Sequence, residues 1–354
     1  MRNDPTQTRP EIEAPARDHS AIRDMAGRAY SEVTYAEALR QGLQQAMELS
    51  DRVLVIGQLV DYVRGVFGST GGLAEQFGRE RVRDFPVSES AMTAVGIGAA
   101  VAGMRPVLVH HRIDFMLYSL DAVVNWLALW RFKSNCKSVL PVTIRAIVGK
   151  GWGQGPQHSK SLHAWFAHVP GLKVAMPATA FDAKGLLLES VFGEDPVIMV
   201  EHRSLYGLKD RVPLQPYRVR FGRAAVRRAG EHVTLVAVGA MVPLALRVAD
   251  LIAEHKVQAE VIDLRTVSPL DTESICKSVE KTGRIAVLDP AWRSFGVSAE
   301  VIARVAERLG RHLLADPLRI GYPDSHTPMS SALEKIYYPD EATVASKIIA
   351  LCKV

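Results

Sequence analysis

Short apolar runs alternate with helical patterns along most of the chain. The run VLVIG at residues 53–57 follows a stretch at 34–50 whose apolar residues recur at helical spacing, behind Thr34 and Glu37 at capping-box spacing. This alternation is typical of a parallel sheet that is covered by helices on both faces. The same pattern predicts strands at 106–110, 141–148, 173–177 and 196–201, and helices at 90–103, 116–132 and 180–192.

A second alternating unit follows a connector that is rich in Arg, Pro and Tyr and shows no strand or helix period. Its strands are predicted at 233–239, 259–265, 284–289 and 317–321, and its helices at 242–255, 271–281 and 296–309. The fold class is therefore α/β, with two doubly wound domains that can each hold a ligand at the carboxyl ends of their strands. The predicted divisions are a mobile polar arm at 1–30, a first domain at 31–205, a linker at 206–225 and a second domain at 226–354.

Composition removes several classes of function. No uncharged apolar run approaches the roughly 18 residues that a membrane span needs, so no membrane partner is expected. The net charge is +5, but the basic residues are interspersed with acidic ones and form no block, so no nucleic-acid partner is expected either. The three cysteines show no CxxC spacing, which argues against a disulfide framework or a thiolate zinc site. A reducing, cytoplasmic location is the expectation.

The segment PVSESAMTAVGIGAAVAG at 86–103 joins a polar strand end to a helix of small residues. Gly96 and Gly98 predict close packing of this helix on another backbone. Glu89 is unusual at the first turn of so apolar a helix. From the sequence alone, the simpler explanation is that Glu89 complements the positive helix terminus. The alternative is an acid, shielded from water, that shares a proton with a ligand nitrogen.

A glycine-rich segment at 149–177 matches neither GxxxxGK[ST] nor GxGxxG, so it is interpreted as a flexible active-site loop and not as a phosphate cradle. His158, His163 and His168 recur every five residues, which fits neither one helix face nor a metal motif. His158 stays open between a surface and a catalytic role, because it lies between the loop and a helix start.

The segment HHRIDFMLYSLDAVVNW at 110–126 joins a strand to an apolar stretch. Periodicity alone favours the core for Phe115, Tyr118 and Trp126. His110 and His111 are candidate cleft residues, because they stand where a predicted strand ends.

Several sequence blocks, in their order along the chain, are together specific for one protein family, although no block is specific alone. They include GVFGSTGGLAEQFGRERVRDFPVSESAMTAVGIGAAVAGMRPV at 65–107, GPQHSKSLHAWFAHVPGLKVAMP at 155–177, DAKGLLLESVF at 182–192 and VIDLRTVSPLD at 261–271. With them the chain, from about residue 33 onward, resembles the beta subunit of the thiamine-diphosphate-dependent component of 2-oxo acid dehydrogenases, such as pyruvate dehydrogenase. The resemblance implies a thiamine pyrimidine-binding domain with a mainly parallel sheet, followed by a transketolase C-terminal-like domain.

The resemblance also implies roles for single residues. Glu89 matches the glutamate that hydrogen-bonds the aminopyrimidine and promotes its imino form, Phe115 matches the aromatic residue that packs on that ring, and His158 matches the active-site histidine. The implied activity is decarboxylation of a 2-oxo acid, with pyruvate as the leading substrate, and transfer of the acyl group to a lipoyl carrier. The alternatives are a split transketolase-like or biosynthetic enzyme that transfers a ketol or acyl group, and a noncatalytic scaffold subunit.

The sequence contains only half of the family's cofactor site. No Gly-Asp dipeptide is present, and the asparagines are Asn3, Asn125 and Asn135, so an alpha subunit is expected to supply the diphosphate and magnesium half in an alpha-beta heterotetramer. A potassium ion is expected near Val191, Glu194 and Asp195. His111-Arg112 and Asp289-Pro290 depart from the family pattern, which leaves open the substrate and the docking to a lipoyl acyltransferase core.

Overall fold

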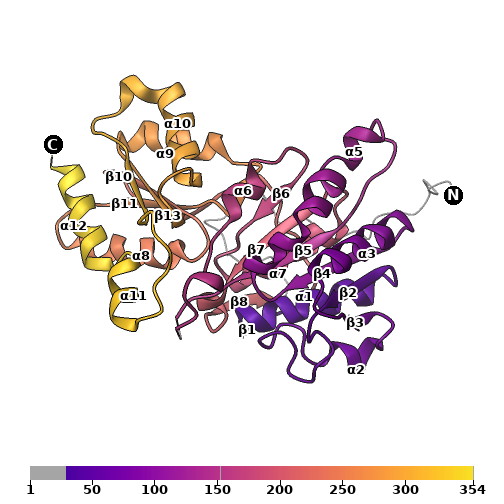
Figure 1. Cartoon of the computed structure of the whole chain (residues 1–354). Helices are drawn as coiled ribbons and strands as arrows, with labels where there is room; N and C mark the ends of the chain where they lie inside the picture. The colour runs from indigo at the N-terminus through magenta and orange to yellow at the C-terminus, as the bar shows by residue number, and fades with distance from the viewer. Residues whose placement is uncertain (1–28, 152, 354) are drawn as a thin grey trace.

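The computed structural model describes residues 29–151 and 153–353, which form two lobes that are each built around a sheet (Figure 1). The first sheet has seven strands in the order β12-β6-β7-β5-β4-β2-β3. All neighbouring strands in it are parallel except β12 and β6. Its strands are β2 (Val53–Gly57), β3 (Val82–Asp84), β4 (Arg105–His110), β5 (Thr143–Val148), β6 (Lys173–Ala175), β7 (Val197–His202) and β12 (Thr266–Ser268).

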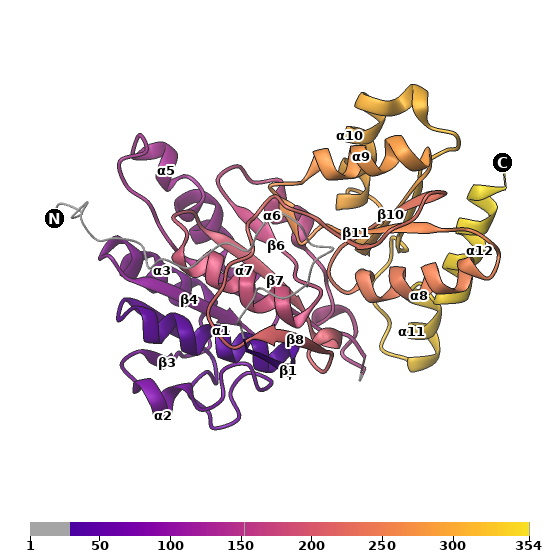
Figure 2. The ribbon, with the colours of Figure 1, turned by 180° about the vertical axis from the view of Figure 1, so that it is seen from behind.

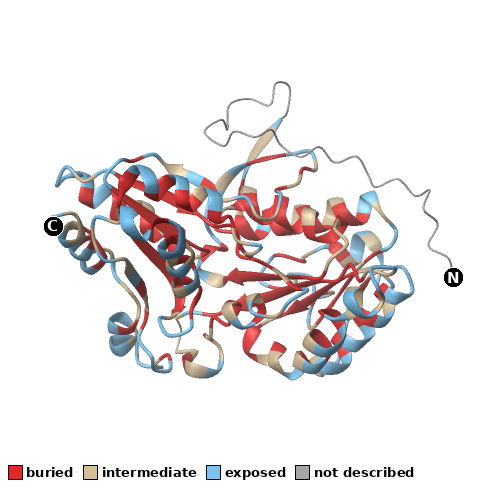
Figure 3. Ribbon diagram, turned by 90° about the horizontal axis from the view of Figure 1, so that it is seen from above, coloured by how far each residue is buried: buried red, intermediate tan, exposed pale blue. Residues whose placement is uncertain are grey.

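The apolar runs become strands because both faces of this sheet are buried (Figure 3). Val53 and Val55 of β2 pack into a cluster with α1 (Tyr35–Leu49) and α7 (Ala180–Phe192). Ile56 points to the other face, where it joins a cluster with α3 (Glu89–Val101) and α6 (His163–Ala167). Continuous hydrophobic strands are the expected consequence of such two-sided cover.

Two local predictions for the helices can be checked directly. The capping box of α1 is confirmed, because the Glu37 backbone N–H donates to Thr34 Oγ1 at 3.2 Å and the Thr34 N–H donates to Glu37 Oε2 at 2.7 Å. In α3, a Cβ on Gly96 would lie 2.8 Å from Leu108 Cδ2 of β4, so this glycine does permit close packing. The neighbouring atoms belong to the Leu108 side chain and not to a backbone, and Gly98 is exposed with no described atom within 4 Å of its Cβ position, so close packing on another backbone is not seen within the described residues.

The helix predicted at 116–132 is wrong in form. It is broken into α4 (Ile113–Met116), the 3-10 turn η1 (Leu117–Ser119), the π-helical η2 (Asp121–Leu127) and α5 (Trp130–Lys133). The two halves bend by 58°, and Tyr118 and Trp126 are 74% and 50% exposed and therefore not in the core of this chain. In the described part of the chain, no single helix is long and apolar enough to cross a membrane; only this bent pair, counted together, meets both criteria.

The second sheet has five strands in the order β14-β13-β10-β11-β9, with β9 antiparallel to its neighbour. Helices α8 and α12 pack on one face of it, and α9 and α10 pack on the other (Figure 2). Its elements are β9 (Ala225–Arg228), β10 (Val233–Ala237), α8 (Met241–Ala253), β11 (Ala259–Asp263), α9 (Thr272–Thr282), β13 (Ile285–Trp292), α10 (Val297–Leu309), η5 (Gly310–His312), β14 (Leu318–Tyr322), α11 (Ser331–Tyr337) and α12 (Glu341–Cys352).

The ends of the first predicted domain contain strands that the sequence does not predict. Strand β1 (Tyr30–Thr34) pairs antiparallel with β8 (Lys209–Pro213), which lies inside the expected linker and follows the 3-10 turn η4 (Arg203–Leu205). The two strands come from opposite ends of the first domain's sequence and are stabilised by pairing with each other. Neither therefore needs a hydrophobic pattern of its own that would reveal it in the sequence. Residues 1–28 of the predicted polar arm lie outside the described residues. The remaining short elements are α2 (Leu73–Phe77) and the 3-10 turn η3 (Gly155–Gln157).

Candidate functional site

A cavity of about 490 Å³ lies at the carboxyl ends of three neighbouring strands of the first sheet. Strand β2 leads into Gln58 and Leu59, strand β3 leads into residues 84–87, and strand β4 ends in His110. This is the place where an open parallel sheet offers a ligand site, since the loops there diverge and expose backbone and side-chain groups. The lining residues are Gln58, Leu59, Asp84, Phe85, Pro86, Val87, Glu89, His110, His111, Arg112 and Phe115.

Glu89 lines this cavity from the first turn of α3. Its side chain is half-buried and its helix begins after Ser88, which makes no side-chain capping hydrogen bond. The carboxylate therefore stands near the positive end of the helix and at the cavity wall at the same time. The two interpretations of Glu89 from the sequence are compatible in this geometry.

Phe115 and His158 lie together, although 43 residues of chain separate them. Their ring centroids are 5.2 Å apart and the rings meet edge to face. Phe115 comes from α4, directly after β4, and His158 ends the turn η3 in the loop that follows β5. Since β4 and β5 are neighbours, their carboxyl ends bring both rings to one edge of the sheet. The structure thus places Glu89, Phe115 and His158 around one region.

The glycine-rich loop that carries His158 is held by the second lobe. Gly151 N–H donates to Glu334 Oε1 of α11 at 2.9 Å, and the Lys150 ammonium lies 4.1 Å from the ring centroid of Tyr338. The Lys160 ammonium, just past the loop, is 3.2 Å from Asp114 Oδ1 of α4. One end of this loop is thus held by the second lobe and the other end by the first. These contacts join residues that are far apart in the sequence, so they could not be predicted from it.

Two histidines at the end of β4 are kept uncharged by their surroundings. Burial, and then the neighbouring His111, lowers the pKa of His110 to about 3. Burial also lowers the pKa of His111, although a hydrogen bond with the Gln58 backbone opposes this change. A neutral imidazole has one N–H donor and one bare nitrogen acceptor. At neutral pH both side chains therefore present hydrogen-bonding groups and no charge. The expectation that they are cleft residues is met by their position.

Among the residues that the structure describes, Arg112 is the one arginine that lines this cavity. Its guanidinium donates to the His111 carbonyl oxygen at 2.6 Å and to Gln154 Oε1 at 3.1 Å, and it lies 5.2 Å from the ring centroid of Phe67. Burial lowers its pKa, as the charge of Arg203 also does. Gln58 and Gln154 are site residues that the sequence reasoning missed, because loop glutamines carry no distinctive motif.

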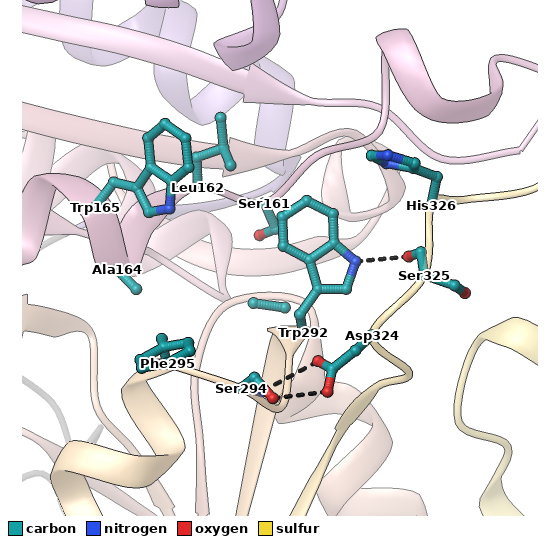
Figure 4. A pocket seen from close by; sticks show the side chains of 12 residues that line it. Ser161, Leu162, Ala164, Trp165, Trp292, Ser294, Phe295, Asp324, Ser325 and His326 are labelled. Atoms are coloured by element: carbon teal, nitrogen blue, oxygen red, sulfur yellow. Dashed lines mark hydrogen bonds between the residues drawn. The ribbon is translucent and has the colours of Figure 1, made fainter.

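A second cavity, of about 540 Å³, contains none of the predicted site residues. It lies between α6 and the turn after β13, where Trp165, Trp292 and Phe295 form apolar walls (Figure 4). Ser294 Oγ donates to Asp324 Oδ2 at 2.6 Å and Trp292 Nε1 donates to the Ser325 carbonyl oxygen at 2.7 Å, which orders its rim. The cavity beside β4 is therefore the candidate active-site cavity.

The residues near the expected potassium site are held by cations of the protein. The Arg105 guanidinium donates to the carbonyl oxygens of Val191 and Gly193, at 2.8 Å each. Arg131 contacts Glu194 and Asp195, and the Lys173 ammonium is 2.9 Å from Asp195. These contacts stabilise the negative carboxyl end of α7. Because side-chain cations already use these oxygens, the arrangement does not fit a potassium ion.

Two further sequence expectations can be placed. Among the described residues, no group of three or more His, Cys, Asp or Glu side chains is positioned to hold a metal ion. Asp289, near the expected core-docking motif, is buried and its Oδ1 lies 2.8 Å from His163 Nε2, while its Oδ2 accepts the Ser298 N–H at 3.1 Å. Asp289 and His163 therefore join the two lobes and do not form a docking surface.

Comparison with known proteins assigns each lobe to a domain family. Residues 31–209 match the family model of the transketolase pyrimidine binding domain, and residues 222–344 match that of the transketolase C-terminal domain. The fold resembles a split-gene transketolase in an inactive beta4 tetramer, with a TM-score of 0.73 and 20% identity over 91% of this chain and 98% of that one. A Pichia stipitis transketolase mutant gives a TM-score of 0.64 and 16% identity over 91% of this chain and 46% of the other.

Relatives of higher identity extend over almost the whole chain. The beta subunit of an acetoin:2,6-dichlorophenolindophenol oxidoreductase from Cupriavidus necator is 39% identical over 87% of this chain and 94% of the relative. The 2-oxoisovalerate dehydrogenase beta subunit of Bacillus subtilis is 38% identical over 90% and 99% of the two chains. The pyruvate dehydrogenase E1 beta subunit of the same organism is 37% identical over 89% and 97%. The chain belongs to this family of 2-oxo acid dehydrogenase E1 beta subunits and related oxidoreductase beta subunits, with transketolase pyrimidine-binding and C-terminal domains.

Proposed function

We propose that this chain is the beta subunit of a thiamine-diphosphate-dependent 2-oxo acid dehydrogenase, with Glu89, Phe115 and His158 as its active-site residues. The observation that carries the proposal is that Glu89 and Phe115 line one cavity and that the Phe115 ring meets the His158 ring, at the carboxyl ends of β3, β4 and β5. When bound, thiamine diphosphate supplies an electron sink for decarboxylation. Pyruvate is the first substrate to test, and a lipoyl arm is the proposed acyl acceptor.

The residues of the cavity suit an aminopyrimidine ring. Such a ring needs an acid for a ring nitrogen, an aromatic face to stack on and a hydrogen-bonding partner for its amino group. Glu89 and Phe115 provide the first two, and His110 has two buried ring nitrogens without a hydrogen-bond partner. In this proposal Glu89 exchanges a proton with the ring nitrogen, Phe115 orients the ring, and His158 handles the substrate and the incoming acceptor.

The other half of the site belongs to a partner in this proposal. The chain lacks a Gly-Asp dipeptide, so magnesium and the diphosphate are assigned to an alpha subunit, in an alpha-beta heterotetramer. Potassium is left out of the proposal, since Arg105 occupies the carbonyl oxygens at the end of α7. The described cysteines are all free, in keeping with the proposed cytoplasmic location.

The test uses the alpha-beta complex with thiamine diphosphate and magnesium. Glu89→Gln should lower thiamine-dependent decarboxylation by about 100-fold or more, which is the usual scale of proton-transfer catalysis, and should leave the melting temperature unchanged. The matched control is Glu80→Gln, which removes an exposed carboxylate paired with Arg83. His158→Ala should impair acyl transfer to a lipoyl domain more than cofactor binding.

Three results would overturn parts of this proposal. Unchanged turnover in Glu89→Gln would remove its proton-transfer role. Equal loss of cofactor binding and acyl transfer in His158→Ala would make that residue structural. Turnover of sugar phosphates without reduction of lipoyl groups would favour a split transketolase-like enzyme, and absence of any thiamine chemistry in the complete complex would favour a scaffold subunit.

A further inference from the structure

Three consecutive nitrogen-bearing side chains enter the candidate active-site cavity where β4 ends. His110 is the last residue of the strand, and His111 and Arg112 form the extended link to α4. All three line the cavity together with Glu89 and Phe115. The proposed cofactor role uses Glu89, Phe115 and one ring nitrogen of His110, and it leaves the other His110 nitrogen, His111 Nε2 and Arg112 Nε unused.

His110 is buried with its hydrogen bonds unmade. It is 1% exposed, and neither Nδ1 nor Nε2 has a partner, while His111 Nε2 is also buried without one. A buried polar group that lacks a partner costs free energy, so native proteins seldom leave one unless a ligand or water satisfies it. Since these nitrogens belong to residues of the cavity wall, a ligand with hydrogen-bonding groups is the natural partner.

Arg112 adds positive charge to this wall. Two of the five N–H donors of a guanidinium are used, on the His111 carbonyl oxygen and on Gln154, and Nε is buried without a partner. Within the described part of the chain, Arg112 has no carboxylate at ion-pair distance; the charge of Asp114 acts on it from farther away, and Asp84 and Glu89 share the cavity wall. A second guanidinium, that of Arg203, lies 4.6 Å from the centroid of the same Phe67 ring on which Arg112 packs. Two cations thus converge on one aromatic residue.

The position of Arg112 joins the cavity to the loop of His158. A Cβ on Gly149 would lie 2.2 Å from Gln154 Oε1, 2.3 Å from the His158 carbonyl oxygen and 3.0 Å from Arg112 Nε, so all three groups crowd around this glycine. A cavity of about 490 Å³ is much larger than a pyrimidine ring. Room therefore remains beside the proposed ring position for part of a substrate, next to a buried cation.

We propose that Arg112, with His110 and His111, forms a subsite for an oxyanion at the far end of the substrate, and that the enzyme takes a donor or acceptor carrying such a group. This inference rests on the thiamine chemistry of the proposed function and refines its substrate class: a dicarboxylic 2-oxo acid fits the proposed dehydrogenase, whereas a phosphorylated sugar fits the split transketolase-like alternative. Pyruvate has no second anionic group. A dicarboxylic 2-oxo acid and a phosphorylated sugar share the required chemistry, because carboxylate and phosphate both accept paired hydrogen bonds from a guanidinium.

The test compares substrates that differ in one charge. With the complete alpha-beta complex, kcat/KM is measured for 2-oxoglutarate against 2-oxopentanoate, and for fructose 6-phosphate against fructose. The wild-type enzyme should prefer the anionic member of one pair. Arg112→Met should lower that preference by about 10- to 100-fold, the scale of a hydrogen bond to a charged group. Arg112→Gln removes the charge but keeps N–H donors, so comparison with Arg112→Met distinguishes the contribution of the charge from that of hydrogen bonding. The control is Arg79→Met, whose exposed side chain is outside the cavity.

A binding measurement keeps this inference separate from the proposed function. Calorimetric titration of the same compounds into the complex, loaded with a thiamine diphosphate analogue that does not turn over, reports the subsite without catalysis. A preference for 2-oxoglutarate or for fructose 6-phosphate that disappears in Arg112→Met supports the subsite and identifies its source. No preference, or one that persists in the variant, overturns the subsite even if pyruvate is decarboxylated. A lower affinity of Arg112→Met for thiamine diphosphate with unchanged substrate preference also overturns it, and makes Arg112 a cofactor residue.

Discussion

Glu201→Gln tests how a fully buried ion pair stabilises the sheet below the site. Arg145 on β5 donates to both carboxylate oxygens of Glu201 on the adjacent β7, at 2.6 and 2.8 Å. Tyr206 Oη donates to Glu201 Oε2 at 2.6 Å, and both charged side chains are completely shielded from water. The amide keeps the shape but leaves the Arg145 cation without its counter-charge. Breaking such a pair costs about 3 to 5 kcal/mol.

The assay measures the free energy of unfolding of the full-length chain in urea, with tryptophan fluorescence and circular dichroism as the two probes of the transition. Asp51→Asn is the control, because Asp51 is fully exposed and lies 3.4 Å from Arg81, where an ion pair contributes about 1 kcal/mol or less. The double variant Arg145→Met, Glu201→Leu should recover much of the loss, since it removes both buried charges together. A loss for Glu201→Gln no greater than that of the control would refute the reasoning.

Two further predictions concern charges farther from the cavity. Burial alone would raise the pKa of Asp182, but Arg227 and Arg265 lower it to about 2, so its stabilisation is present above the ordinary carboxyl pKa and is lost as the pH falls through 4 toward 2. Asp182→Asn should therefore flatten the dependence of the urea midpoint on pH in that range; an unchanged slope would contradict the assignment. At the end of α7, replacing KCl by choline chloride at constant ionic strength should leave the melting temperature unchanged, whereas Arg105→Gln should destabilise the chain by about 1 to 3 kcal/mol. A potassium-dependent melting temperature in the unaltered chain would show that the Arg105 contacts do not replace the ion.

The apolar strands of both sheets were predictable because their information is local, whereas the short strands β3, β9 and β12 were not predicted. A strand such as β2, buried on both faces, must be apolar at every position, and this produces a run that stands out in the sequence. The same is true of α1, whose start is fixed by Thr34 and Glu37 within one turn. Elements stabilised by distant partners were not predictable. Strand β12 is an example, since it comes from the second half of the chain and pairs with β6 of the first sheet.

The site was predictable to the extent that topology orders it. Glu89 follows β3, His110 ends β4 and Phe115 follows β4; only β2 separates these two parallel strands, so the sheet brings all three positions to one edge. Periodicity misjudged Tyr118 and Trp126, because a helical period assumes an unbroken helix, whereas the chain bends by 58° between Ser119 and Asp121.

The contacts that fix His158 show where sequence reasoning must stop. Its loop is held by Glu334, which is 183 residues from Gly151, and the adjacent lobe is joined through His163 and Asp289, which are 126 residues apart. Local sequence patterns cannot reveal contacts between residues so far apart. In the sequence, each of these four residues is indistinguishable from an ordinary surface or core residue of its own element. The position of the His158 loop therefore depends on the docking of the second lobe, and changes in α11 should alter this loop without touching the cavity itself.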